Sequence, residues 1–369
     1  MAHKQNTPTK IHKKTLILGI QAPYNSIANI DSYFEEFTNL VKTNRVVYDK
    51  EFFIKLRTID STYFITKGKL EEIKTFCEQN NIEEIIVSEP LTAQQERNIS
   101  DILDCNILDR TGLILQIFEK AAHSAEGKTQ VGIAMLQYKK TRIAGKGVSM
   151  SQQAGHFGTR GPGETAKEKE LRHINNNILR LRRQLAVMHK ARETQRKRRI
   201  NAQVPHICLI GYTNAGKSTI LNALTKSNVY AQDQLFATLD TTTRELYIDG
   251  QKKGLLSDTV GFIQLLPHQL IEAFKSTLSE LQYADLLLHV VDASNPNFPD
   301  HIKVVQDILT ELKVNKPILY VFNKADKIIN NTRFMEDIIP YMPRVIVNSL
   351  SKETLQELND FLASWQITE

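Results

Sequence analysis

Short apolar runs alternate with amphipathic stretches along the amino-terminal part of the chain. The apolar runs have the length of strands, and the stretches between them carry apolar residues at helical spacing. They follow one another at residues 15–20, 30–42, 46–54, 68–79, 84–87 and 92–103. This alternation predicts a small α/β subdomain with a largely parallel sheet over residues 1–112. It contains no catalytic constellation, and we expect His12 and its scattered Asp and Glu residues to lie at the surface.

The pattern changes to long helices after about Leu113. Apolar residues continue at helical spacing through Val131 and Tyr138, without strand punctuation. A second helix from about Glu164 carries apolar residues that step by 3 and 4, which is the a/d seam of packed helices. The seam residues are Leu171, Ile174, Ile178, Leu181, Leu185 and Met188. We therefore predict an antiparallel, coiled-coil-like helical hairpin over residues 113–200.

Strand-like runs return in residues 201–369. The runs at 285–292 and 318–322 are continuously apolar, as expected of central parallel strands buried on both faces. Further strands are expected at 205–210, 244–248, 255–258 and 345–347. The predicted fold class of this third domain is α/β with a mostly parallel sheet.

A phosphate-binding motif lies between the first of these strands and a helix predicted at 218–226. Residues 211–218 match the P-loop pattern of Gly, four residues, then Gly-Lys-Ser/Thr, in the strand–loop–helix context that the motif requires. Lys217 can reach the β/γ phosphates of a nucleotide, and the Ser218 hydroxyl can bind Mg²⁺. The predicted phosphate-binding residues are Gly211, Tyr212, Thr213, Asn214, Ala215, Gly216, Lys217, Ser218 and Thr219.

Two segments after the P-loop have the order and spacing of nucleotide switches. The Thr238 hydroxyl can complete Mg²⁺ coordination, so Ser218 and Thr238 are the predicted metal ligands. The D-x-x-G sequence begins 41 residues after Lys217; Asp258 would contact Mg²⁺ through water, and the Gly261 N–H the γ-phosphate. Lys217, Thr238 and Gly261 are the predicted catalytic residues. The predicted contacts in these segments are Phe236, Ala237, Thr238, Leu239, Asp240, Asp258, Thr259, Val260 and Gly261.

The sequence Asn-Lys-Ala-Asp at 323–326 indicates the base. An Asp326 carboxylate at the carboxyl end of a strand can accept hydrogen bonds from N1–H and N2–H₂ of guanine, which adenine cannot offer. The motif therefore favours GTP over ATP and makes 201–369 a GTP-binding domain. Asn323 can tie this loop to the P-loop, and the Lys324 stem can lie along the base. The predicted base contacts are Asn323, Lys324, Ala325, Asp326, Ser349 and Leu350, the last two to within one residue.

Composition adds bounds on the setting of the protein. The 369 residues are 41% hydrophobic, no apolar run approaches the roughly 18 residues of a membrane span, and the amino terminus is polar. We expect a cytoplasmic protein without integral membrane association. Three separated cysteines, Cys77, Cys105 and Cys208, predict neither a disulfide framework nor a zinc site, and Cys208 is expected in the core. Nothing demands an oligomer, so we expect a monomer.

The charge is concentrated in one segment. The chain carries +6, whereas residues 167–199 contain twelve Lys/Arg and three Glu, a net charge of 12 − 3 = +9. The segment indicates a polyanion partner, because phosphate contacts dominate nucleic-acid affinity; the alternative is a solvated helix face. The loop at 144–164 before it is rich in glycine, with Lys146 and Arg160. It is either a segment that orders on a phosphate-rich surface or a flexible connector.

These motifs together resemble the HflX family of GTPases over nearly the whole chain. The resemblance rests on Phe157-Gly-Thr-Arg-Gly-Pro-Gly-Glu164, Tyr212–Thr219, Asp233–Asp240 and Asp258–Ile263, with Asp109-Arg-Thr and Glu126-Gly-Lys. It implies a GTPase that binds the large (50S) ribosomal subunit and splits or rescues ribosomes, often under stress. It also implies that the helical subdomain and its glycine loop contact 23S rRNA, with no DNA partner.

Several positions depart from the family pattern or from GTPases in general. Thr241 stands where the family usually has Pro, and Ala166-Lys-Glu168 stands where it has Gln-Leu-Glu. The base-binding Ser-Ala of the family has no clear match here, where the chain has Ser349-Leu350. Phe262 stands where many GTPases place a water-orienting Gln, which predicts slow intrinsic hydrolysis. Gln264 is expected to face solvent or the partner. Asn214 resembles the asparagine of potassium-stimulated GTPases, so K⁺ is a further expected cofactor.

The sequence is also compatible with two other functions. One is a GTPase that acts in large-subunit assembly rather than in splitting. The other is a non-ribosomal switch that uses the basic helix to bind a protein or an acidic membrane surface. The sequence contains no second P-loop to support an ATPase or helicase activity in the amino-terminal subdomain.

Overall fold

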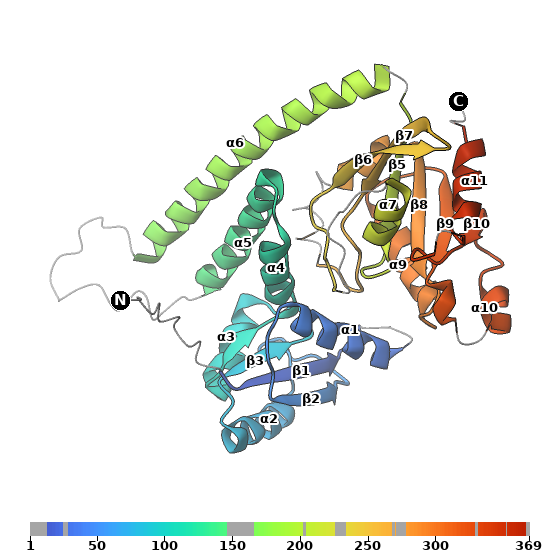
Figure 1. Cartoon of the computed structure of the whole chain (residues 1–369). Helices are drawn as coiled ribbons and strands as arrows, with labels where there is room; N and C mark the ends of the chain where they lie inside the picture. The colour runs from blue at the N-terminus through green and yellow to red at the C-terminus, as the bar shows by residue number, and fades with distance from the viewer. Residues whose placement is uncertain are drawn as a thin grey trace, which may run out of the picture. The chain divides into compact units, whose positions relative to one another are not determined.

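The computed structural model describes most of the chain (Figure 1). The described residues are 13–24, 29–145, 166–201, 204–225, 234–267, 270, 278–328, 331–351 and 353–366. They form two compact units: Met1–Ile114 with Thr141–Lys167, and Leu115–Lys140 with Glu168–Glu369. The predicted division into three domains stays a prediction. Most of the predicted glycine loop, including Lys146 and Arg160, lies outside the described residues, as do His12 and Asp233.

The first unit contains a parallel sheet, as predicted. Its strands run in the order β2-β1-β3-β4, and all of their pairs are parallel. The strands are β1 (Thr15–Gln21), β2 (Lys50–Lys55), β3 (Glu84–Val87) and β4 (Asn106–Leu108), and the helices are α1 (Ile30–Thr43), α2 (Lys67–Asn80) and α3 (Ala93–Leu103). Strand β4, with three residues, was not predicted because so short a run has no readable period.

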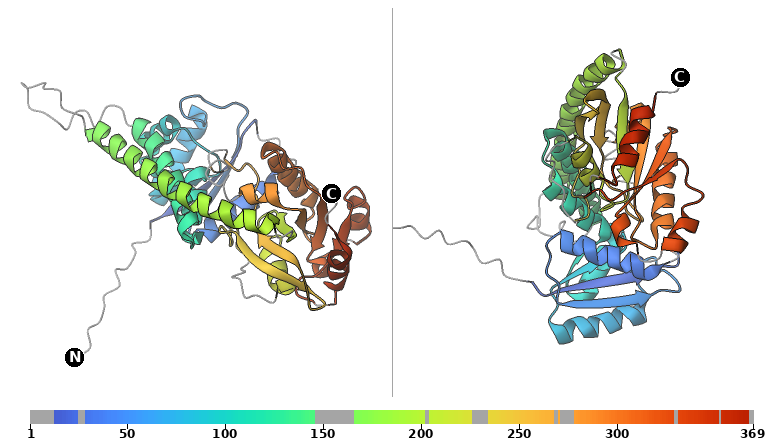
Figure 2. Two further views of the ribbon diagram at one scale, coloured as in Figure 1. Left: turned by 90° about the horizontal axis from the view of Figure 1, so that it is seen from above. Right: turned by 45° about the vertical axis from the view of Figure 1, so that its right-hand side comes forward.

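Alternate side chains of β1 point to opposite faces of this sheet. Leu16, Leu18 and Ile20 pack in one core with Leu70 of α2 and Ile99 of α3. Helix α1 lies on the opposite face, as the right-hand view of Figure 2 shows. The central strand is therefore buried on both sides, which explains its continuous apolar run.

Several acidic residues of this unit are buried, so the expectation that they lie at the surface was wrong. Glu36 is 9% exposed and bonds Arg110, with 2.6 Å between Oε1 and Nη2. Arg110 is fully buried and lies over the Tyr33 ring. Glu89 accepts the hydroxyl protons of Tyr24 and Tyr33 at 2.5 and 2.9 Å. Buried carboxylates need such partners, and these come from distant parts of the sequence.

Replacing Glu36 by alanine is expected to destabilise the first unit by about 3–5 kcal/mol, because it removes the carboxylate that the fully buried Arg110 guanidinium bonds. Amide hydrogen exchange of β1 measures this effect as a protection loss of roughly 10²- to 10⁴-fold. The neighbouring Glu35→Ala, at an exposed position of the same helix, is the matched control. Equal protection in the two variants would contradict the prediction.

The helical segment differs from the prediction in one respect. The first predicted helix is broken into α4 (Arg110–Ala121) and α5 (Ala125–Gly145), and α6 follows at Ala166–Asn201. The break lies at Ser124, whose hydroxyl accepts the Gly127 N–H at 2.9 Å and caps α5.

Helices α5 and α6 pack antiparallel, as expected. The pairs Lys139–Glu170 and Glu126–Arg192, both at 3.1 Å, join opposite ends of the two helices. Figures 1 and 2 show α6 running along α5. The seam residues of α6 are all buried or half-buried, whereas its flanking positions are mostly exposed. The predicted stripe is therefore the packing face of the helix.

The second unit also contains a sheet of six strands in the order β10-β9-β8-β5-β7-β6. The strands are β5 (His206–Gly211), β6 (Thr242–Ile248), β7 (Gln251–Asp258), β8 (Leu286–Asp292), β9 (Ile318–Asn323) and β10 (Arg344–Ile346). Strands β6 and β7 form an antiparallel hairpin with an irregularity between Leu246 and Tyr247, and the other pairs are parallel. The predicted mostly parallel sheet is confirmed.

Helices cover both faces of this sheet (Figure 2). They are α7 (Lys217–Thr225), α9 (Phe298–Glu311), α10 (Asn331–Asp337) and α11 (Gln356–Ser364), with short 3₁₀ turns η1 (Ser279–Tyr283) and η2 (Ala325–Lys327). One core joins α7 and α11 to the sheet, and Cys208 of β5 is fully buried in the strand, as expected. Another core joins α9 and α10 to β8 and β9.

The topology places a crevice at the end of β5. This strand pairs with β7 on one side and with β8 on the other, so the chain connections that leave the ends of neighbouring strands run to opposite sides of the sheet. In open α/β sheets, ligands bind outside the carboxyl ends of the strands at such a point.

Candidate nucleotide-binding site

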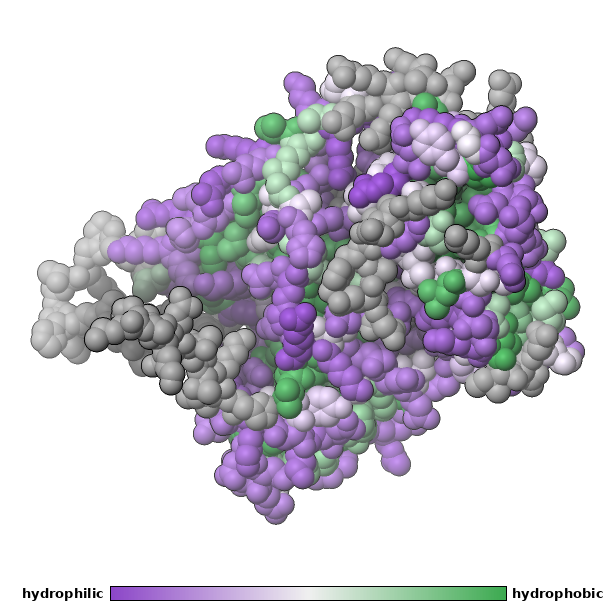
Figure 3. Space-filling view, viewed as in Figure 1, coloured by the Kyte–Doolittle hydropathy of each residue, from purple (hydrophilic) through white to green (hydrophobic). Residues whose placement is uncertain are grey.

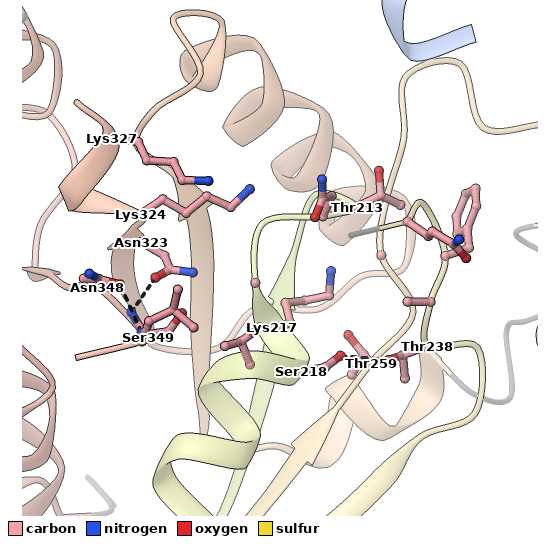
Figure 4. Close-up of a pocket in the computed structure, with 18 of the residues that line it drawn as sticks. Thr213, Lys217, Ser218, Thr238, Thr259, Asn323, Lys324, Lys327, Asn348 and Ser349 are labelled. Carbon is pink, nitrogen blue, oxygen red and sulfur yellow. Dashed lines mark hydrogen bonds between the residues drawn. The ribbon is translucent and has the colours of Figure 1, made fainter. Parts of the chain in front are cut away.

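A cavity of about 320 Å³ opens at this end of the sheet (Figure 4). The P-loop, the segment before β6 and the loops after β7, β9 and β10 line it. The lining residues predicted from sequence are Thr213, Asn214, Gly216, Lys217, Ser218, Thr219, Phe236, Ala237, Thr238, Thr259, Gly261, Asn323, Lys324, Asp326, Ser349 and Leu350. Residues far apart in the chain thus meet in one cavity because their strands are parallel and end together.

Lys217 lies at the phosphate end of the cavity. Its side chain is 6% exposed, and its ammonium donates to the backbone carbonyls of Gly211 and Tyr212 at 3.1 and 2.8 Å. Burial lowers the pKa of Lys217 to about 8, although Asp258 opposes the shift. An anion bound beside the ammonium would favour its charged form. The arrangement is therefore suited to a phosphate group.

The P-loop backbone approaches the base-side loop closely. Gly216 has a φ of +95°, and a Cβ at this position would overlap the side-chain nitrogen of Asn323. Asn323 donates that nitrogen's hydrogen to the Ala215 carbonyl at 2.9 Å and accepts the Ser349 N–H at 3.0 Å. One asparagine thereby joins the P-loop, β9 and the loop after β10, and only glycine fits opposite it.

Three oxygen-bearing side chains converge beside Lys217. The Ser218 hydroxyl lies 2.8 Å from the Thr238 hydroxyl and donates to Asp258 Oδ2 at 2.5 Å. Figure 4 shows Ser218 and Thr238 turned toward each other. Burial raises the pKa of Asp258, while Lys217 and both hydroxyls lower it. Hydroxyl and carboxylate oxygens are the ligands that Mg²⁺ prefers, so the residues fit this metal.

The other end of the cavity carries polar groups suited to a base. Lys324 and Lys327 reach over it in Figure 4. Lys324 pairs with Asp292 at 2.6 Å, which fixes its stem beside the opening. Asp326 lies in η2 and is exposed to the cavity. Asn348 accepts the Leu350 N–H at 3.0 Å and so shapes the loop after β10.

The remaining predicted contacts do not line the described cavity. They are Gly211, Tyr212, Ala215, Leu239, Asp240, Asp258, Val260 and Ala325. Among them, the Tyr212 ring stacks on His301, with the ring centroids 3.8 Å apart. Sequence reasoning missed Gln234, Lys327 and Asn348. The last two adjoin predicted motifs, so their positions next to Asp326 and Ser349 were the available signal.

Asp240 makes a contact that differs from its prediction. Its carboxylate accepts the backbone N–H groups of His123 and Ser124 at 2.9 and 2.7 Å, and the Ser124 hydroxyl at 2.5 Å. It thus faces the start of α5 rather than the nucleotide cavity.

The loop after Asp258 turns two side chains away from the cavity. Phe262 is 1% exposed and lines a small apolar space with Phe118 and Phe236. Gln264 is 5% exposed, and its N–H donates to the Tyr212 hydroxyl at 2.8 Å. The expectation that Gln264 faces solvent or a partner was therefore wrong.

Helix α6 presents a basic surface, mainly hydrophilic in Figure 3. Its exposed basic residues include Lys169, Arg180, Arg182, Arg183, Lys190 and Lys197. Two other basic residues turn inward: Arg192 bonds Glu126 at 3.1 Å, and Arg196 bonds Glu280 at 3.1 Å and lies over the Tyr283 ring. Part of the positive charge therefore holds the helix in place, and the exposed remainder faces outward.

Three family models match consecutive parts of the chain. Residues 31–119 match the amino-terminal region of a GTP-binding GTPase, and residues 121–199 match the middle region. Residues 206–324 match the model described as a 50S ribosome-binding GTPase. Within the part of the chain that the structure describes, no helix is long and apolar enough to cross a membrane.

A solved structure shares the architecture. The crystal structure of SsGBP in complex with GDP is 26% identical, with a TM-score of 0.52 and coverage of 95% of this chain and 97% of that chain.

Curated relatives extend the match. The GTPase HflX of Caldanaerobacter subterraneus is 48% identical over 273 residues, which are 74% of this chain and 64% of the relative, slightly under two thirds of its length. That of Flavobacterium psychrophilum is 42% identical over 89% of this chain and 79% of the relative, and that of Escherichia coli is 42% identical over 76% and 65%. By these matches over most of its length, the chain belongs to the HflX family of GTPases.

Proposed function

We propose that the chain binds GTP in the cavity at the carboxyl ends of β5, β9 and β10 and hydrolyses it to GDP and phosphate. The observation that carries this proposal is that Lys217 and Asp326 line the same cavity, one from the P-loop and the other from the Asn-Lys-Ala-Asp loop. GDP in the related crystal structure of SsGBP supports it.

The residues of the cavity have different roles in phosphoryl transfer. The Lys217 ammonium neutralises charge on the β/γ phosphates, and the Gly261 N–H donates to the γ-phosphate. Ser218 and Thr238 would hold Mg²⁺ directly and Asp258 would do so through water; the metal supplies further charge neutralisation. Phe262 is buried and has no group that orients water. Intrinsic hydrolysis is therefore slow, and an external group completes the site.

A potassium ion is our candidate for part of this external contribution. Asn214 lines the cavity with a left-handed φ of +62° and lies in the P-loop, which we propose holds the β/γ phosphates. Its side-chain oxygen can ligate K⁺ there. GTP turnover by the purified chain is expected to be higher in KCl than in NaCl, and the difference should disappear in Asn214→Ala. Equal wild-type turnover in the two salts would count against this role.

We further propose that the chain acts in the cytoplasm on the large (50S) ribosomal subunit, through contact with 23S rRNA, and splits or rescues ribosomes in a GTP-dependent way. The exposed basic residues of α6 are suited to RNA phosphates. The description of the matching family model points to the same partner. GTP favours the bound state, and hydrolysis favours release.

Purified 50S subunits are expected to stimulate GTP hydrolysis strongly. Replacing the exposed Arg180, Arg182 and Arg183 by glutamine should weaken binding to the subunit and lower the dependence of log K on log salt by roughly 2 to 3, because about one phosphate contact is lost per arginine. The matched control replaces Lys74, Lys303 and Lys313, which are exposed elsewhere, by glutamine. Stimulation that is absent, or equally reduced in the control, would contradict the proposal.

Light scattering of 70S particles separates splitting from a role in assembly. A GTP-dependent fall in scattering supports splitting. Stimulation by 50S subunits without any fall in scattering favours the assembly role instead. An unchanged hydrolysis rate with 50S subunits leaves a non-ribosomal switch.

A further inference from the structure

The switch segment, residues 234–241, is fastened to the helices on both sides of Thr238. Before Thr238, Phe236 packs edge-on against Phe118 of α4, with ring centroids 4.7 Å apart at 84°. After Thr238, Asp240 accepts three hydrogen bonds from His123 and Ser124. Between these anchors, the Thr238 hydroxyl faces Ser218.

The anchor at Asp240 is part of the helix cap of α5. Ser124 accepts the Lys128 N–H on its carbonyl at 3.0 Å and the Gly127 N–H on its hydroxyl at 2.9 Å. The same hydroxyl donates to Asp240, so it serves the helix and the switch segment at once. A carboxylate is favourable at a helix amino terminus, where the dipole and the N–H groups are positive.

The contact between Asp240 and α5 requires a glycine at position 127. It is buried in the first turn of α5, and a Cβ there would overlap the Asp240 carboxylate. Glycine is a poor helix former, so alanine would suit the isolated helix better. The close approach of Asp240 gives a physical reason for glycine at this position.

The anchor at Phe236 holds the backbone in an uncommon conformation. Phe236 has a φ of +57°, in the left-handed region that residues with a Cβ seldom occupy, and its ring is 2% exposed. The packing against Phe118 must therefore outweigh a local conformational cost. A third contact comes from α6, where Arg192 donates to the Thr241 hydroxyl at 3.2 Å. The proline that the family pattern has at position 241 has no side-chain hydroxyl to accept this hydrogen bond.

We propose that Ser124, Gly127 and Asp240 form a latch that positions Thr238 for the Mg²⁺-bound triphosphate, so that the capped start of α5 favours the GTP form of the site over the GDP form. This inference rests on the proposed GTP function. Asp240 is a positioning residue: its carboxylate touches α5, and it acts on the nucleotide through Thr238. Because coupling is reciprocal, the GTP form stabilises the start of α5 in return.

The test compares affinities for a non-hydrolysable GTP analogue and for GDP, both with Mg²⁺, in the full chain. Ser124→Ala, Asp240→Asn and Gly127→Ala are each expected to weaken analogue binding by about tenfold, within the usual range of coupling, and to change GDP binding less than about twofold. Ser124→Thr keeps the hydroxyl and should restore analogue binding. Asp249→Asn, at an exposed turn of the same unit, is the matched control.

Gly127→Ala separates the latch from a merely structural role. It keeps every hydrogen-bonding group and improves helix propensity, so a loss of fold does not account for weaker analogue binding. In the wild type, the analogue should also protect the Gly127 and Lys128 amides from hydrogen exchange more than GDP does. Equal losses for both nucleotides, or no loss in any variant, would overturn the latch. Failure of the wild type to bind either nucleotide would instead overturn the proposed GTP function.

Discussion

Lys217→Ala is expected to lower GTP hydrolysis by about 10²- to 10³-fold, since it removes the buried ammonium that neutralises phosphate charge. Lys217 is enclosed by the P-loop, and its ammonium bonds two P-loop carbonyls. No other described lysine makes these contacts, so none can replace its charge there. Hydrolysis is measured by phosphate release, alone and with 50S subunits.

The matched control for this variant is Lys303→Ala, which removes an exposed lysine of α9 in the same unit. Its turnover should equal that of the wild type. If 50S subunits raised the hydrolysis rate of Lys217→Ala to near that of the wild type, the ribosome would supply the missing positive charge. Our assignment of Lys217 as a catalytic residue would then fail.

Asp326→Asn is expected to change base preference from guanine to xanthine. The carboxylate accepts from N1–H and N2–H₂ of guanine, whereas an amide presents a hydrogen to N2–H₂ and loses that bond. The lost hydrogen bond to a charged group contributes about 1.5–3 kcal/mol, which corresponds to a loss of GTP affinity of roughly 10- to 10²-fold. Xanthine carries an oxygen at C2 that accepts from the amide, so xanthosine triphosphate should bind the variant better than GTP.

Competition binding with GTP, ATP and xanthosine triphosphate measures this preference. Asp307→Asn, at an exposed position of α9, is the control and should keep the wild-type order. An Asp326→Asn variant that still prefers GTP would show that other groups, such as Lys327 or Asn348, select the base.

The cavity was predictable from sequence because its motifs are local. A P-loop or an Asn-Lys-Ala-Asp turn specifies its own backbone, and parallel strands bring such turns to one edge of a sheet. Thr213, Lys217 and Asn323 therefore line the cavity together, as their motifs indicate. The break before α5 also had a local signal, since Ser124 followed by Glu126 is a typical helix start.

What could not be predicted depends on partners distant in sequence. The carboxylate of Asp240 bonds a residue 116 positions away, and Glu36 bonds Arg110 at a separation of 74. Gln264 is 5% exposed, and its backbone N–H donates to the hydroxyl of Tyr212, which lies 52 positions away. Nothing in the residues next to these side chains distinguishes a buried polar group with a tertiary partner from an exposed one.

The hairpin of β6 and β7 has a consequence for how the molecule behaves in a crowded solution. Among the described strands, β6 lies at one edge of its sheet, where unpaired backbone groups invite pairing with another chain. Its irregularity at Leu246 and the exposed charges of Arg244 and Glu245 discourage such pairing. At the opposite edge, β10 has only three residues. Both margins of the sheet thus resist edge-to-edge aggregation.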